Sequence, residues 1–123
     1  MQMIDVEVSK LKPFSRRKFF YDDIKGRQWE GFLESVRNNG VIVPISITQN
    51  YIIINGHQRV RACKKLGIKN VKCIMIKCKN NDEIIKNMIA ANIQQGRELN
   101  PNFFKGLMCI LEINRIRKKT VNN

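Results

Sequence analysis

Acidic residues are scarce in this chain, and that shortage narrows the range of partners it can have. Of its 123 residues, 10 are Asp or Glu and 23 are Lys or Arg, so the formal net charge is +13. No acidic residue occurs between Ser35 and Asn81. A field of this sign attracts polyanions, above all nucleic acids and nucleotides. General solubility, in a chain whose overall composition favours Lys, Asn and Ile, is the alternative explanation for this charge.

Histidines are scarce, and cysteines at metal-binding spacing are absent, which argues against a metal centre. The chain has one histidine, and its four cysteines (Cys63, Cys73, Cys78 and Cys109) lack the spacing of a zinc knuckle or a redox pair. We therefore predict no metal site, with Cys63 and Cys73 as small core residues in a reducing compartment.

Long hydrophobic runs are absent as well. No apolar run approaches the roughly 18–20 residues that a membrane span needs. The residues that follow Met1 are not typical of a secretory signal. We expect a cytoplasmic protein without a membrane partner.

The hydrophobic pattern predicts an α+β fold with a small mixed sheet. The polar, basic and aromatic segment 9–27 is predicted to be an irregular arm. The segment from Asn92 to Asn100 is predicted to interrupt the helical pattern. The predicted strands are 3–8, 45–48, 51–54 and 71–76, and the predicted helices are 28–39, 57–66, one that begins near 80–82, and a long one from 101 to about 118.

The last predicted helix is apolar over a wider arc than one small domain would cover. This predicts a domain core over 1–97, followed by a segment, 98–123, that either mediates self-association or leads to a DNA-binding domain absent here. A central helix that is buried all round is the alternative.

One strand–turn–helix stretch is the best candidate for a binding site. The apolar run 51–54 ends at Asn55 and Gly56, where a basic helix begins. The first N–H groups of a helix point outward, its dipole favours an anion, and Arg59 adds a charged fork. We predict phosphate binding by Gly56 and Arg59. A structural ion pair between Arg59 and an acidic residue is the alternative.

Four segments of the chain, in order, resemble one known family. They are Val6-Glu7-Val8 with Lys10 to Pro13, the run from Phe32 to Gly40 with Pro44-Ile45, the residues Gly56, Arg59 and Ala62, and Asn92-Ile93-Gln94 with Leu99-Asn100-Pro101. Together they resemble the N-terminal domain of ParB-type partition proteins, which has the ParB/sulfiredoxin fold and would end here in a long C-terminal helix.

The resemblance implies a CTP-like nucleotide as ligand. In that family the glycine turn and the arginine helix hold the triphosphate, which implies Gly56, Arg59 and Asn92 as contacts here. We add His57, at the start of the helix, and Gln94, in the asparagine segment.

The resemblance also implies partners, namely DNA, a second copy of the chain and other segregation proteins, at the nucleoid or on a plasmid. Sequence-specific DNA reading in the family comes mainly from a region after this domain. We therefore expect contact mostly with the DNA backbone. The candidate residues for it are Arg16, Arg17, Arg61, Lys64 and Lys65.

Departures from the family pattern argue against catalysis. Ala91 stands where the family usually has a Glu tied to the metal ion, and a methyl group cannot ligate Mg²⁺. The family arginine is displaced to Arg97. His57 takes the place of the catalytic cysteine of related sulfiredoxins, so reductase chemistry has no nucleophile.

Two other functions fit the same residues. A protein–protein adaptor would use the last helix to form dimers or filaments, with Gly56–Arg59 as a relic. A nucleotide-dependent phosphotransferase or nuclease would need a carboxylate near Arg59, and Asp82, Glu83 and Glu98 are its candidates.

Overall fold

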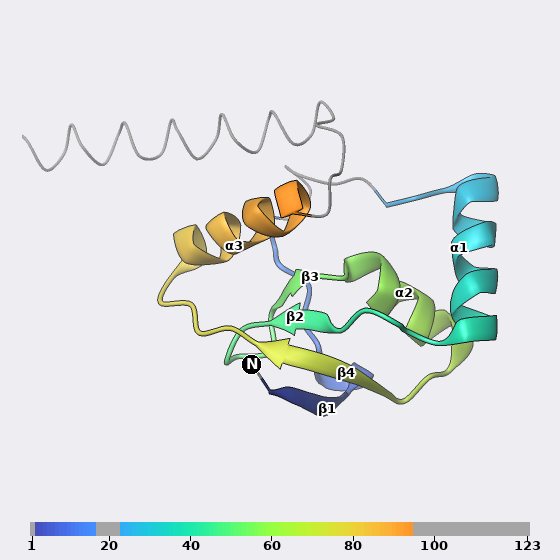
Figure 1. The fold of residues 1–123 in the computed structure, drawn as a ribbon, viewed down its shortest axis with the longest axis horizontal. Helices are drawn as coiled ribbons and strands as arrows, with labels where there is room; N and C mark the ends of the chain where they lie inside the picture. Colours follow the sequence, from blue (N-terminus) through green and yellow to red (C-terminus); the bar gives the residue numbers. More distant parts are fainter. Residues whose placement is uncertain (1, 17–22, 95–123) are drawn as a thin grey trace, which may run out of the picture.

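The computed structural model describes residues 2–16 and 23–94, with the side chains of 92–94 left aside. Along this part of the chain the elements follow the predicted order (Figure 1). They are β1 (Met3–Glu7), the 3₁₀ turn η1 (Val8–Lys10), α1 (Gly26–Asn39), β2 (Ile45–Ile47), β3 (Ile53–Asn55), α2 (His57–Leu66), β4 (Asn70–Met75) and α3 (Asn81–Gln94). The predicted helix over 101–118 and the segment 98–123 lie outside the described residues.

The strands form one mixed sheet in the order β1-β4-β2-β3. Strand β4 pairs antiparallel with β1 and parallel with β2, and β2 pairs antiparallel with β3. The small mixed α+β sheet expected from the hydrophobic pattern is therefore confirmed.

Helix α2 covers one face of the sheet. Val60 and Cys63 of the helix pack in one buried cluster with Ile45, Ile47 and Cys73 of the strands. The prediction that Cys63 and Cys73 are core residues is confirmed, because both are fully buried. Burial raises the pKa of the Cys63 thiol, and it is the main reason that the pKa of Cys73 rises to about 11.

Helix α3 packs on the other face, against β3. Ile84, Ile85 and Met88 of the helix form a second buried cluster with Ile54 and Phe14. Asn80 caps this helix, since its Oδ1 accepts the Glu83 N–H at 3.1 Å. The predicted interruption over Asn92–Asn100 begins too early, because α3 continues to Gln94. The rest of that range lies outside the described residues. Asn92, Ile93 and Gln94 contain no glycine or proline, so nothing in them stops a helix.

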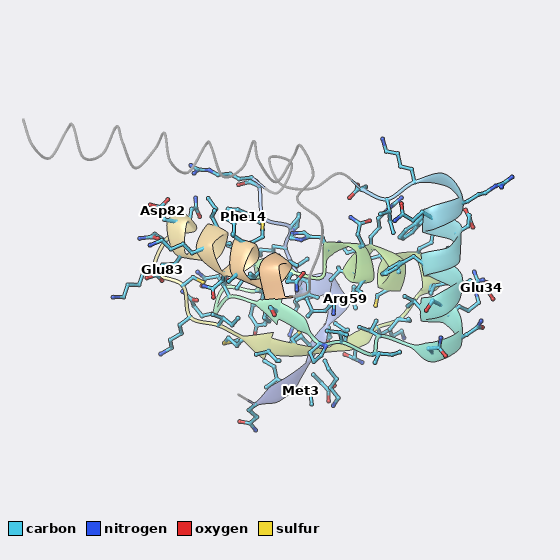
Figure 2. All side chains as sticks on the ribbon, turned by 45° about the horizontal axis from the view of Figure 1, so that its top comes forward. Met3, Phe14, Glu34, Arg59, Asp82 and Glu83 are labelled. Atoms are coloured by element: carbon cyan, nitrogen blue, oxygen red, sulfur yellow. The ribbon has the colours of Figure 1, made fainter. Side chains whose placement is uncertain are left out.

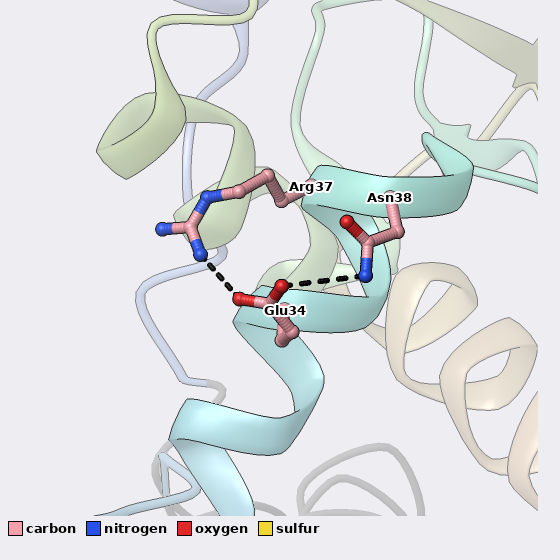
Figure 3. Close-up of polar contacts among 3 residues, drawn as sticks. All are labelled: Glu34, Arg37 and Asn38. Atoms are coloured by element: carbon pink, nitrogen blue, oxygen red, sulfur yellow. Dashed lines mark hydrogen bonds and ion pairs between the residues drawn. The ribbon is translucent and has the colours of Figure 1, made fainter.

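Helix α1 uses the predicted apolar stripe, with Leu33 and Val36 buried against Ala62 of α2. It begins at Gly26, slightly earlier than predicted. On its outer side Glu34 pairs with Arg37 and also accepts a bond from Asn38 Nδ2 at 3.3 Å (Figure 3). Because both ion-pair partners are more than half exposed, this pair adds little stability.

The β2–β3 hairpin departs from the predicted strand 51–54. Tyr51 has a positive φ of 65°, so it belongs to the turn, and β3 begins only at Ile53. The predicted irregular arm also has a regular part. The Lys12 N–H donates to Tyr51 O at 2.9 Å, and the Ile53 N–H donates to Lys12 O at 2.8 Å. These two bonds occupy the outer edge of the hairpin, where backbone groups need partners.

The packing at the junction of β3 and α2 requires glycine at position 56. Its φ is 109°, and a Cβ there would lie 2.6 Å from Ile45 Cδ1. We predict that Gly56→Ala lowers the free energy of unfolding by about 2–4 kcal/mol, through backbone strain and the clash. Urea denaturation would measure it.

Gly31→Ala is the matched control. Gly31 lies inside α1 with nothing within 4 Å of the new Cβ, so this change should add about 0.5–1 kcal/mol. Equal effects of the two substitutions would contradict the account of Gly56.

Candidate anion site at the start of α2

The junction of β3 and α2 has the geometry predicted for an anion site. Strand β3 ends at Asn55, and Gly56 caps α2 in a left-handed conformation. Its carbonyl accepts the Val60 N–H at 2.9 Å, which closes the first helical turn. The glycine brings no side chain to the N–H groups of that turn, and the first turn contains no acidic residue. The end of the helix can therefore accept a negative group.

Arg59 is held beside the same turn. Its Nη1 donates to Val43 O at 2.6 Å and to Pro44 O at 3.1 Å. Its Nη2 lies 3.4 Å from the position a Cβ would take at Gly56. Figure 2 shows Arg59 in this region, where the chain enters β2. Two backbone carbonyls thus fix the guanidinium next to the glycine turn.

His57 and Gln58 tie this turn to the arm that precedes α1. The Phe14 N–H points to His57 Nε2 at 3.5 Å, a long contact. Gln58 Oε1 accepts the Ile24 N–H at 3.3 Å, and its Nε2 donates to Asp23 Oδ1 at 2.8 Å. The role of Gln58 was missed from the sequence, because nothing local marks a partner 35 positions away.

Arg61 has an intramolecular role that its charge did not reveal. Its guanidinium lies over the Trp29 ring, 3.7 Å from the centroid, and donates to Ile24 O at 2.8 Å. It also bonds Gln58 Oε1 at 3.2 Å. The residue therefore joins α2 to α1 and to the segment before it. Whether it also contacts DNA stays a prediction.

The other predicted contact residues lie on several different elements. Lys64 and Lys65 are exposed in the last turn of α2, and Arg16 is partly exposed. Arg17 lies outside the described residues. The backbone of Asn92 and Gln94 forms the end of α3, the helix that packs against β3 (Figure 1). Ala91 precedes them in the same helix.

The described residues hold no group of three or more His, Cys, Asp or Glu that could bind a metal ion. None of the described helices has the length and apolar character of a membrane span.

Comparison with known proteins places the chain in a family. The ParB N-terminal domain family matches the chain over residues 1–93, so the chain belongs to that family. A probable chromosome-partitioning protein ParB of Vibrio cholerae is 32% identical over 100 residues, which cover 76% of this chain and 32% of the relative. A Rickettsia typhi ParB is 31% identical over 93 residues, covering 73% of this chain and 30% of the relative. The chain thus spans about a third of these relatives.

Solved structures agree on the fold. A Pnob8-like ParB-N domain superimposes with a TM-score of 0.77 at 22% identity, covering 98% of this chain and 50% of that chain. The Caulobacter crescentus ParB complexed with CTP-γ-S gives 0.67 at 20% identity, covering 76% and 54%. Sulfiredoxin from Arabidopsis thaliana gives 0.54 at 21% identity, covering 63% and 88%. The expected ParB/sulfiredoxin-like fold is confirmed.

Arg61 gives a test of the α1–α2 junction. We predict that Arg61→Ala lowers the free energy of unfolding by about 1–2 kcal/mol, because the Trp29 contact and the bond to Ile24 O are lost. Thermal or urea unfolding would measure the change. Lys65→Ala, which removes the same charge from an exposed site of the same helix, should stay within about 0.5 kcal/mol. A comparable loss in both variants would show that charge, not the contact, stabilises the junction.

Proposed function

We propose that this chain is the N-terminal domain of a ParB-type DNA partition protein that binds a CTP-like nucleotide at the start of α2. The observation that carries the proposal is the junction itself, where Gly56 opens a ten-residue helix and Arg59 is fixed beside it. This is the arrangement in which a helix N-terminus and a guanidinium hold phosphate.

His57, Asn92 and Gln94 are the remaining contacts in this proposal. His57 begins α2, and Asn92 and Gln94 lie at the end of α3, which contacts β3. The structure of a family member complexed with CTP-γ-S supports CTP as the nucleotide to test first. We do not propose hydrolysis, because Ala91 offers no oxygen ligand for Mg²⁺.

DNA is the proposed macromolecular partner, through backbone contacts. Lys64 and Lys65 are exposed, and the chain has no acidic residue between Ser35 and Asn81. Since no acidic residue close in sequence offsets these two charges, their positive electrostatic field extends into solvent. Arg16 and Arg17 belong to the same proposed set. Arg61 is less suited to it, since its guanidinium is engaged by Trp29 and Ile24 O.

Self-association is the last part of the proposal. A second copy of the chain would bind through the segment 98–123, and other segregation proteins would join the assembly. The site of action would be the cytoplasmic nucleoid or a plasmid.

Calorimetric titration tests nucleotide binding. We expect CTP to bind the wild-type chain and Arg59→Ala to weaken the affinity by about tenfold or more, because a charged hydrogen-bond donor to phosphate is lost. Arg59→Lys should fall between the two, since it keeps the charge but not the fork. Lys65→Ala, at the other end of α2, should change the affinity by less than about twofold. No CTP binding by a folded wild-type chain would overturn the nucleotide proposal.

A salt series tests the DNA proposal. We expect the affinity for duplex DNA to fall steeply with added salt. The double variant Lys64→Ala/Lys65→Ala should reduce the slope of log affinity against log salt by about 2, one unit per lost phosphate contact. Lys77→Ala/Lys79→Ala removes the same charge from exposed residues before α3 and should leave the slope nearly unchanged. Equal slopes for both double variants would argue for general charge and against this surface.

A further inference from the structure

Asn55 is a buried polar residue whose side chain no described residue satisfies. It lies at the end of β3, directly before Gly56, and only 8% of it is exposed. Within the described part of the chain its carboxamide makes no hydrogen bond, either as donor or as acceptor. Buried polar side chains usually have a partner, and leaving one unpaired disfavours the folded state.

The same hairpin contains a contrasting case. Thr48 is the other buried polar residue of the described chain, and it is 1% exposed. Its Oγ1 accepts the N–H groups of Asn50 and Ile52, each at 3.2 Å, so its burial is explained by the turn it holds. No such structural role accounts for Asn55.

The register of the sheet tells which way Asn55 points. Asn55 pairs with Ser46 across the hairpin, past an irregularity in the β2–β3 register. Paired residues share a face, so Asn55 lies on the Ser46 side, opposite Ile45 and Ile47, which pack against α2. The Ser46 side is the side on which Ile54 meets α3. The carboxamide therefore lies on the face that α3 covers, one residue before the glycine turn that opens α2.

We propose that the Asn55 carboxamide is a further ligand contact, in which Nδ2 donates a hydrogen bond to a phosphate oxygen held at the start of α2. The inference rests on the proposed nucleotide function and adds to it a neutral donor. Phosphate oxygens only accept, so the amide group matches them through its NH₂. The ligand then supplies the partner that the protein does not.

Paired measurements of stability and binding test this. The variant Asn55→Ala removes the amide, and Thr48→Val is its matched control from the same hairpin. Each would be unfolded thermally without ligand and titrated with CTP and with inorganic tripolyphosphate. We expect Asn55→Ala to keep or raise Tm and to weaken both ligands by about tenfold. Thr48→Val should lower Tm and leave both affinities within about twofold of wild type.

The outcomes separate this inference from the nucleotide proposal. If Arg59→Ala loses CTP while Asn55→Ala binds like wild type, the nucleotide site stands and the Asn55 contact is refuted. If Asn55→Ala lowers Tm and leaves affinity unchanged, the amide is structural and the inference fails. Weaker CTP binding with unchanged tripolyphosphate binding would assign the amide to the nucleoside, against a phosphate contact. If the wild type binds neither ligand, both proposals fall together.

Discussion

The contact between Gly56 and Ile45 is the constraint on which the rest of this domain depends. Residue 56 must turn the chain out of β3 and into α2 while its backbone passes over the side chain of a central strand. A residue with a Cβ meets Ile45 there, and the left-handed backbone is costly for any residue except glycine. The same close approach sets α2 against the sheet and fixes its first turn directly after β3, so packing and the candidate site share one cause.

The sequence predicted the order of elements well because each carries a local signal. The stripe of α1, the asparagine cap of α3 and the glycine ends of α1 and α2 are readable from neighbouring residues. The errors arose where the partner is distant. The bridge of Lys12 to the hairpin and the turn at Tyr51 depend on pairing between segments that no local pattern connects.

The residues of the candidate site also fall into two groups, those with a local sequence signal and those without one. Gly56 and Arg59 stood out because a glycine before a basic helix is a local feature. Gln58 and Asn55 did not stand out. Gln58 acts through residues of the arm, and Asn55 is notable only for its burial. Arg61 shows the limit of charge as a guide, since its guanidinium serves the contact between two helices. Some basic residues of a chain serve binding and others stabilise the fold, and the coordinates are needed to tell the two groups apart.

The sheet order has a consequence for synthesis of the chain on the ribosome. Strand β4 lies between β1 and β2 and is the last of the described strands to be translated, yet Met3 of β1 pairs with Ile74 within it. The first strand emerges long before its neighbour exists, and its edge stays unpaired meanwhile. The nascent domain cannot close its sheet until β4 has left the exit tunnel, so a stall upstream of Asn70 would leave β1 open to chaperones or to another chain.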